Sequence, residues 1–103
     1  IALELRAYLS YRRLNLDLGF WRSERGHEVD FTIGSKVAIE VKATDLVQER
    51  HISGLRALQE EGIFSSYYVV SRDRAVRSIE GITVYPWRTF LDKLWSGELG
   101  LEG

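Results

Sequence analysis

The sequence of 103 residues is long enough for one hydrophobic core but not for two, which predicts a single domain over residues 1–103. Its 45% apolar and 28% charged residues exclude a disordered or fibrous chain, and the absence of cysteine excludes disulfides and thiolate zinc sites. Fourteen basic against fifteen acidic residues exclude an overall basic field, so binding to nucleic acid would need a local patch.

The first elements are a helix and a short strand. Apolar residues at helical spacing predict an amphipathic helix over residues 1–14, and Phe20 with Trp21 predicts a short edge strand before a polar turn over residues 22–27. The chain opens on this apolar pattern without a methionine, so we expect a piece of a longer protein with a partner domain upstream. No apolar stretch approaches the roughly 20 residues of a membrane span, and no secretory signal is visible, which predicts a cytoplasmic protein.

The strongest pattern along the chain is a β-hairpin. Apolar and polar residues alternate over residues 29–33 and again over 37–41. Either a two-residue turn over 34–35 or a three-residue connection over 34–36 would join the strands. Turn chemistry favours the shorter one, since the longer one is expected to place a left-handed backbone at Lys36.

The register of the hairpin follows from burial. The shorter turn would place Asp30 opposite Ile39, whereas the longer one pairs Phe31 with Ile39 and Val29 with Val41, which keeps one face apolar. A one-residue slip would expose several apolar side chains at roughly 1.5 to 3 kcal/mol each, while an unfavourable left-handed residue costs only about 1 to 2 kcal/mol. We therefore expect the three-residue connection.

A crossover unit follows the hairpin. Asp45 and Gln48 match a capping box, and the apolar residues between positions 52 and 62 predict a helix. The aromatic and β-branched run at 67–70 predicts a strand covered on both faces and parallel to its neighbour.

The end of the chain predicts one more strand and helix. Residues 82–85 form the strand, and Pro86 opens a helix that Gly97 closes. The arginines at 72, 74 and 77 are interspersed with acidic residues and indicate an ordinary helical surface. The order α-β-β-β-α-β-β-α predicts a mixed α/β fold, with a mixed sheet and flanking helices.

Three charged side chains interrupt the apolar hairpin. In the expected register Asp30 lies opposite Glu40, with Cβ atoms about 5 Å apart, where like charges repel. Mg²⁺ or Mn²⁺ between them would turn repulsion into ligation, and Lys42 on the same face would position a nucleophile and neutralise charge. The alternative is a solvated face on which Lys42 forms a weak cross-strand ion pair with Glu28.

A few residues outside the hairpin are secondary candidates. Arg22 and Arg25 precede Asp30 in a loop from which they would clamp phosphates, or they are simply solvated. His27 and His51 lack the spacing of a zinc site and are expected at the surface, with His51 within possible reach of a substrate.

The motifs together resemble a known superfamily. Asp30 and the Glu40-Val41-Lys42 strand, with a helix before and a helix after, resemble the PD-(D/E)XK nuclease-like superfamily. The stretches "FWRSERGHEVDF", "AIEVKAT" and "VYPWRTFLDKLWSGELG" are similar to the uncharacterised C-terminal domain of a family of bacterial and archaeal AAA+-type ATPases. This resemblance implies a restriction-endonuclease-like α-β-β-β-α-β core with flanking helices, and an ATPase domain upstream.

The resemblance also implies roles for single residues. Asp30, Glu40 and the Val41 carbonyl are expected to hold Mg²⁺ or Mn²⁺, Lys42 to assist phosphodiester hydrolysis in DNA, and Glu4 to complete the site from the first helix. The rival hypothesis is an inactive module that kept the fold and serves the ATPase by binding nucleic acid or docking a protein. The intact acidic pair and lysine favour the enzyme, whereas the nearly neutral charge favours the rival.

Overall fold

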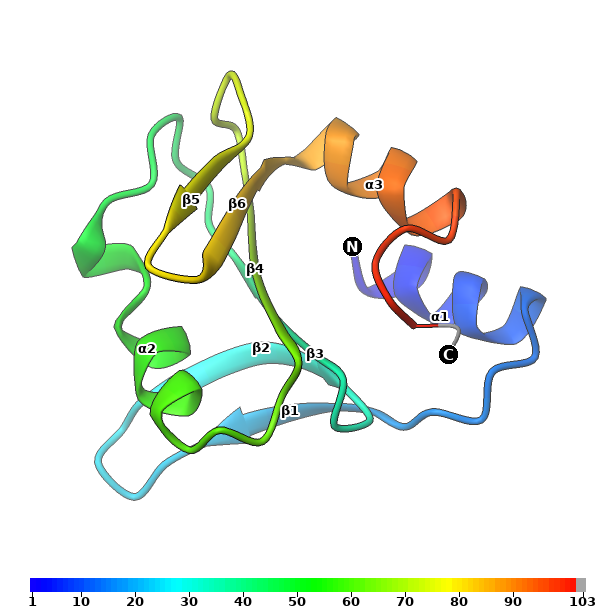
Figure 1. Cartoon of the computed structure of the whole chain (residues 1–103), viewed down its shortest axis with the longest axis horizontal. Helices are drawn as coiled ribbons and strands as arrows, with labels where there is room; N and C mark the ends of the chain where they lie inside the picture. The colour runs from blue at the N-terminus through cyan, green and yellow to red at the C-terminus, as the bar shows by residue number, and fades with distance from the viewer. Residues whose placement is uncertain (102–103) are drawn as a thin grey trace.

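A six-stranded mixed sheet lies at the centre of the fold, with strands in the order β1-β2-β3-β4-β6-β5. The computed structural model describes residues 1–101. Helices α1 and α3 lie together on one face of this sheet and α2 lies on the other (Figure 1). The elements are α1 (Ala2–Tyr11), β1 (Leu18–Arg22), β2 (Glu28–Ile33), β3 (Val37–Val41), the 3-10 turn η1 (Glu49–His51), α2 (Ser53–Glu60), β4 (Ser66–Ser71), β5 (Arg77–Ile79), β6 (Ile82–Pro86) and α3 (Trp87–Trp95).

Each face of the sheet has its own apolar core. Leu5 of α1 and Phe90 of α3 pack with Ile39 on one face, while Leu55 of α2 packs with Val69 on the other. Both faces of the sheet centre are therefore covered, which confirms the predicted mixed α/β fold and its α-β-β-β-α-β order. None of the helices within residues 1–101 is long and apolar enough to cross a membrane.

The crossover predicted after the hairpin is confirmed. From β3 the chain passes through α2 and returns as β4, which pairs parallel to β3 with Glu40 beside Val69. Strand β4 is buried almost throughout and also pairs in parallel with β6. The carboxyl ends of these three parallel strands therefore meet at one edge of the sheet, the edge at which β3 carries Glu40.

The hairpin has the register predicted from burial. Phe31 pairs with Ile39, and three residues connect the strands. The left-handed residue of the connection is Gly34, at φ 54°, and the expectation that it would be Lys36 is wrong. The Lys36 N–H donates to the Ile33 carbonyl at 3.1 Å, so glycine takes the strained position within this register at no steric cost.

The predicted pairing of Val29 with Val41 is also wrong, because β2 contains a bulge. Gly19 of β1 pairs with Thr32, but Trp21 pairs with Val29, so two residues of β2 lie opposite Phe20 alone. The extra residue reverses the side-chain alternation, and Val29 joins the core under α2. The bulge falls at Asp30 and Phe31, beside the charges that interrupt the hairpin.

The helical surface predicted at the arginine cluster is wrong as well. Arg77 begins the edge strand β5, which forms a hairpin with β6 through Glu80 and Gly81, both at positive φ. The side chain of Gln59 on α2 donates to the Glu80 carbonyl at 2.9 Å, and Arg56 forms an ion pair with the Glu80 carboxylate. Two long-range contacts from α2 thus support a turn with a non-glycine residue at positive φ.

Candidate functional site

The carboxylates of Asp30 and Glu40 lie together where the β2–β3 ladder ends. The Asp30 N–H donates to Glu40 Oε1 at 3.3 Å, and the Val41 N–H donates to Asp30 Oδ2 at 2.9 Å. The last regular pair of the ladder is Phe31 with Ile39, so side-chain oxygens replace the backbone carbonyls from this point on. The bulge in β2 and these two hydrogen bonds therefore place both acids at one end of the hairpin.

Lys42 completes the group of charges that the sequence indicated. Its Nζ lies 3.7 Å from Glu40 Oε2, and its backbone N–H donates to the Val70 carbonyl of β4 at 2.9 Å. The alternative pairing of Lys42 with Glu28 is wrong, since the Glu28 carboxylate lies 2.9 Å from Arg22. The structure thus brings Asp30, Glu40 and Lys42 together.

Glu40 is an unusual residue for a strand interior. Only 5% of its surface is exposed, and this burial, reinforced by the neighbouring Asp30 carboxylate, raises its pKa to about 7. Lys42 and the Asp30 N–H oppose the shift without cancelling it. Near neutral pH the Glu40 carboxyl is therefore divided between its neutral and charged forms, and a nearby positive charge would favour the charged form.

The charged group lies in a polar hollow of about 210 Å³. Besides Asp30, Glu40 and Lys42, the residues that line this hollow are Gly26, His27, Glu28, Arg50, His51, Ser53 and Gly54. They come from the turn before β2, from the first residue of β2, from η1 and from the first turn of α2. We call this space the acidic hollow, because three carboxylates face two cationic side chains in it.

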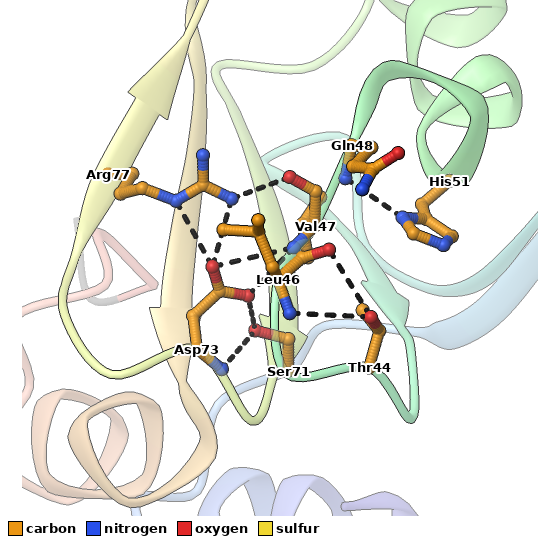
Figure 2. A network of polar contacts seen from close by, with 8 residues as sticks. All are labelled: Thr44, Leu46, Val47, Gln48, His51, Ser71, Asp73 and Arg77. Carbon is orange, nitrogen blue, oxygen red and sulfur yellow. Dashed lines mark hydrogen bonds and ion pairs between the residues drawn. The ribbon is translucent and has the colours of Figure 1, made fainter.

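The wall opposite the strands begins at a reciprocal cap. The Gln48 N–H donates to His51 Nδ1 at 2.8 Å (Figure 2), and the Gln48 side chain completes the capping box by accepting from the His51 N–H. The capping box predicted at Asp45 is wrong, since the Asp45 carboxylate pairs with Arg72 at 3.3 Å. The box at Gln48 starts η1 instead, and η1 places Arg50 and His51 at the acidic hollow.

A buried network fixes the loop that leads from β3 to this cap (Figure 2). Asp73 is 6% exposed and accepts from the Val47 N–H at 3.1 Å, from the Ser71 hydroxyl and from Arg77, which also donates to the Val47 carbonyl. Burial alone would raise the pKa of Asp73, but these hydrogen bonds outweigh it and lower the pKa below its ordinary value. The hydrogen bonds of the charged Asp73 side chain thus anchor the loop before η1 to the end of β4.

Glu4 lies away from the acidic pair. Its Oε2 accepts from Trp95 Nε1 at 3.1 Å, and the Trp95 ring packs edge-on against Tyr8. Within residues 1–101, no group of three or more histidine, aspartate or glutamate side chains gathers as a possible metal site. Of the three predicted acids, only Asp30 and Glu40 therefore have carboxylates placed to bind a cation together, whereas Glu4 of α1 is hydrogen-bonded to Trp95 of α3.

Arg22 and Arg25 line a second hollow, of about 550 Å³, next to the first. His27 lines both hollows. Arg22 is already paired with Glu28, and three glutamates, at positions 24, 60 and 61, also line this space. The two arginines thus adjoin the candidate site, in surroundings that largely offset their charge.

The sequence interpretation missed Arg50 at the acidic hollow and placed His27 merely at the surface. One local signal was available, namely the three-residue spacing of Gln48 and His51, which is that of a reciprocal cap at the start of a helical turn. No signal in the sequence brings His27 to the same hollow, because the turn before β2 reaches it only through the fold.

The fold and the site together define a mixed α/β domain with a buried glutamate, an exposed aspartate beside it and a lysine at the end of a β-hairpin. The chain belongs to the family described as "Domain of unknown function (DUF4143)", whose model matches residues 1–90. Comparison with curated proteins and with solved structures found no match. The matched range includes Asp30, Glu40, Lys42 and the whole acidic hollow.

Proposed function

We propose that this domain is a metal-dependent nuclease of the PD-(D/E)XK type that hydrolyses phosphodiester bonds in DNA. We further propose that it is one domain of a cytoplasmic AAA+-type ATPase, as the resemblance of the sequence implies. The observation that supports the activity best is the convergence of Asp30, Glu40 and Lys42 in one polar hollow. Two acids can hold a metal ion, and a lysine can offset the charge that develops on the phosphate, so the three side chains can supply the roles that metal-assisted phosphodiester hydrolysis needs.

The donor set fits Mg²⁺ or Mn²⁺. Carboxylate oxygens are the preferred protein ligands of these ions, and Mg²⁺ is commonly held by only one or two carboxylates. Asp30 and Glu40 would hold the ion, with the Val41 carbonyl as a third donor. The raised pKa of Glu40 agrees with this role, because burial and the neighbouring Asp30 carboxylate disfavour its ionised form, and a bound cation would compensate for both. When bound, such an ion supplies Lewis-acid assistance to phosphodiester hydrolysis.

The remaining residues have roles that follow from their charges. The Lys42 ammonium would orient the attacking water and offset the negative charge that develops on the phosphate. Arg25, and Arg22 once released from Glu28, would contact phosphates on either side of the cleaved bond. Glu4 would join the site only after leaving Trp95, so we assign it no role in the first step.

A second candidate function is a non-catalytic module that binds nucleic acid or docks a protein for the ATPase. The formal charge of −1 and the position of Glu4 beside Trp95 support it. The two proposals differ in one property, since only the nuclease needs the acidic pair to bind a cation.

A cleavage assay on mixed single- and double-stranded DNA with Mg²⁺ or Mn²⁺ tests the proposed activity. Replacing Asp30 by asparagine removes a metal ligand, and Lys42→Ala removes the cation at the phosphate, so each should lower the rate on the order of 100-fold or more. The assay should compare initial rates of the wild type and both variants at one metal concentration that saturates the wild type.

Lys93→Ala is a matched control for the lysine variant. The Lys93 side chain is 39% exposed and pairs with Glu98, much as the 37% exposed Lys42 pairs with Glu40, but it lies on α3. Its variant should cleave at the wild-type rate. Cleavage that survives both Asp30→Asn and Lys42→Ala would show that the acidic hollow does not carry the activity, and the docking module would then be preferred.

A further inference from the structure

His51 has a fixed arrangement of its ring proton. The Gln48 N–H donates to His51 Nδ1 at 2.8 Å, so this nitrogen is an acceptor and carries no proton. The proton of the neutral ring therefore lies on Nε2. The second half of the cap, from the His51 N–H to the Gln48 side chain, holds the residue in place.

His51 lies at the acidic hollow, where a hydrogen-bond donor could bind an anion. His51 is partly buried and lines the hollow together with Asp30, Glu40 and Lys42. Over residues 1–101, Nδ1 is the one ring nitrogen of His51 with a hydrogen-bond partner. The Nε2–H is thus a fixed donor that the protein itself does not use.

The charges in the hollow determine when an anion can enter it. With Glu40 ionised, the carboxylates of Glu28, Asp30 and Glu40 are balanced by Lys42, Arg50 and the Arg22 that pairs with Glu28. A divalent cation on the acidic pair would make this balance positive. An anion is therefore attracted to the hollow only after the cation binds.

We propose that His51 binds a phosphate oxygen of the substrate through its neutral Nε2–H, and that this phosphate binds after the cation. This inference rests on the proposed function and extends it to a residue outside the acid and lysine group. Arg50, the neighbour of His51 in η1, lies at the same hollow and adds charge to the same phosphate. The ligand class is a phosphate monoester or diester, for which inorganic phosphate serves as the probe.

Two substitutions separate binding of phosphate from capping of η1. The amide of asparagine reproduces an acceptor near the position of Nδ1, and that of glutamine a donor near Nε2. His51→Asn therefore keeps the cap and removes the donor, whereas His51→Gln keeps the donor and removes the cap. A purely structural His51 would make only the glutamine variant defective.

The proposal is tested by titrating the whole domain with inorganic phosphate while NMR spectra are recorded. The titration is done once without Mg²⁺ and once with saturating Mg²⁺. The wild type should bind phosphate only with Mg²⁺, with shifts centred on residues 50–54. His51→Asn should weaken binding about tenfold or more, as expected for loss of one hydrogen bond to a charged group, while His51→Gln stays within about threefold of wild type. Urea unfolding should show the reverse order, with His51→Gln the less stable variant.

Two results would overturn the proposal. One is wild-type affinity for phosphate in His51→Asn, and the other is a wild type that binds Mg²⁺ but no phosphate. Mg²⁺ binding is followed in the same titration, so failure of the metal site itself, which would count against the proposed nuclease, is seen separately. A ring ¹⁵N spectrum with the proton on Nδ1 would also contradict the assignment of His51 as an Nε2–H donor.

Discussion

Replacing Glu40 by glutamine should make the metal-free domain more stable at pH 8, by up to about 3 kcal/mol. The carboxyl of Glu40 is buried beside Asp30, and its pKa in the folded protein is about 7, against an ordinary value of 4.5. Glutamine fills the same space, accepts a hydrogen bond from the Asp30 N–H and cannot ionise. The native residue is therefore a stability cost that a purely structural hairpin would not carry.

The sign of this effect depends on pH. Between pH 4.5 and about 7 the folded protein holds a proton on Glu40 that the unfolded chain has released, so the free energy of unfolding of the wild type falls as the pH rises. Below pH 4.5 Glu40 is protonated in both the folded and the unfolded state. Its ionisation then no longer lowers the free energy of unfolding of the wild type. The advantage of Glu40→Gln should therefore be small at pH 5 and reach its full value near pH 8.

Urea unfolding in EDTA at several pH values measures this difference. Glu49→Gln is the control, because its carboxylate is 67% exposed in a surface pair with Arg56, and its effect should stay within about 0.5 kcal/mol at every pH. A Glu40→Gln variant less stable than the wild type at pH 8, or a difference that does not change with pH, would contradict the raised pKa of Glu40.

Replacing Gly54 by alanine should destabilise the fold by about 3 kcal/mol or more. Gly54 lies in the first turn of α2, where a Cβ would fall 2.2 Å from the Glu28 carbonyl oxygen of β2. That oxygen belongs to a strand backbone and cannot move without disturbing the sheet. The helix would have to separate from β2, and the wall of the acidic hollow would open.

Chemical unfolding of Gly54→Ala checks this expectation, with Ser53→Ala as the control. Ser53 is the exposed neighbour of Gly54 in the same turn, so its change to alanine should alter the free energy of unfolding by no more than about 0.5 kcal/mol. Alanine favours helix over glycine by about 1 kcal/mol, so a neutral or stabilising Gly54→Ala would mean that α2 does not press on β2.

The register of the hairpin was predictable because one physical effect dominated. Burial of Phe31 against Ile39 outweighed turn preference, and the structure has that register. The apolar runs of α2 and β4 were equally clear, since each contains enough apolar residues to define its face. The register predicted that Asp30 and Glu40 lie close together, whereas the bulge and the two backbone hydrogen bonds that hold their carboxylates came only with the structure.

The features that the sequence did not reveal depend on distant contacts. The bulge at Asp30 exists because β1 pairs with β2 around Phe20, and no local pattern marks that offset. Strand β5 is three residues long and depends on β6 and on two side chains of α2. These elements are determined by partners that the fold brings from elsewhere in the chain.

The helix acid shows a further limit of sequence reasoning. Glu4 was expected near the acidic pair by resemblance, but the position of its carboxylate depends on Trp95, which lies 91 residues away. The Trp95 ring also packs against Tyr8 and Tyr11 and is 37% exposed. The helical spacing of apolar residues identifies the buried face of α3. It does not reveal that Trp95, the last residue of α3, binds Glu4 of α1.

The central claim is that Asp30 and Glu40 share one divalent cation, and calorimetric titration with Mn²⁺ tests it most directly. At pH 8 the wild type should bind one ion per chain, and Asp30→Asn and Glu40→Gln should each abolish binding. Below pH 7 the wild-type affinity should fall about tenfold per pH unit, because Glu40 must lose a proton to bind. No binding by the wild type at pH 8, or undiminished binding by both variants, would contradict the claim.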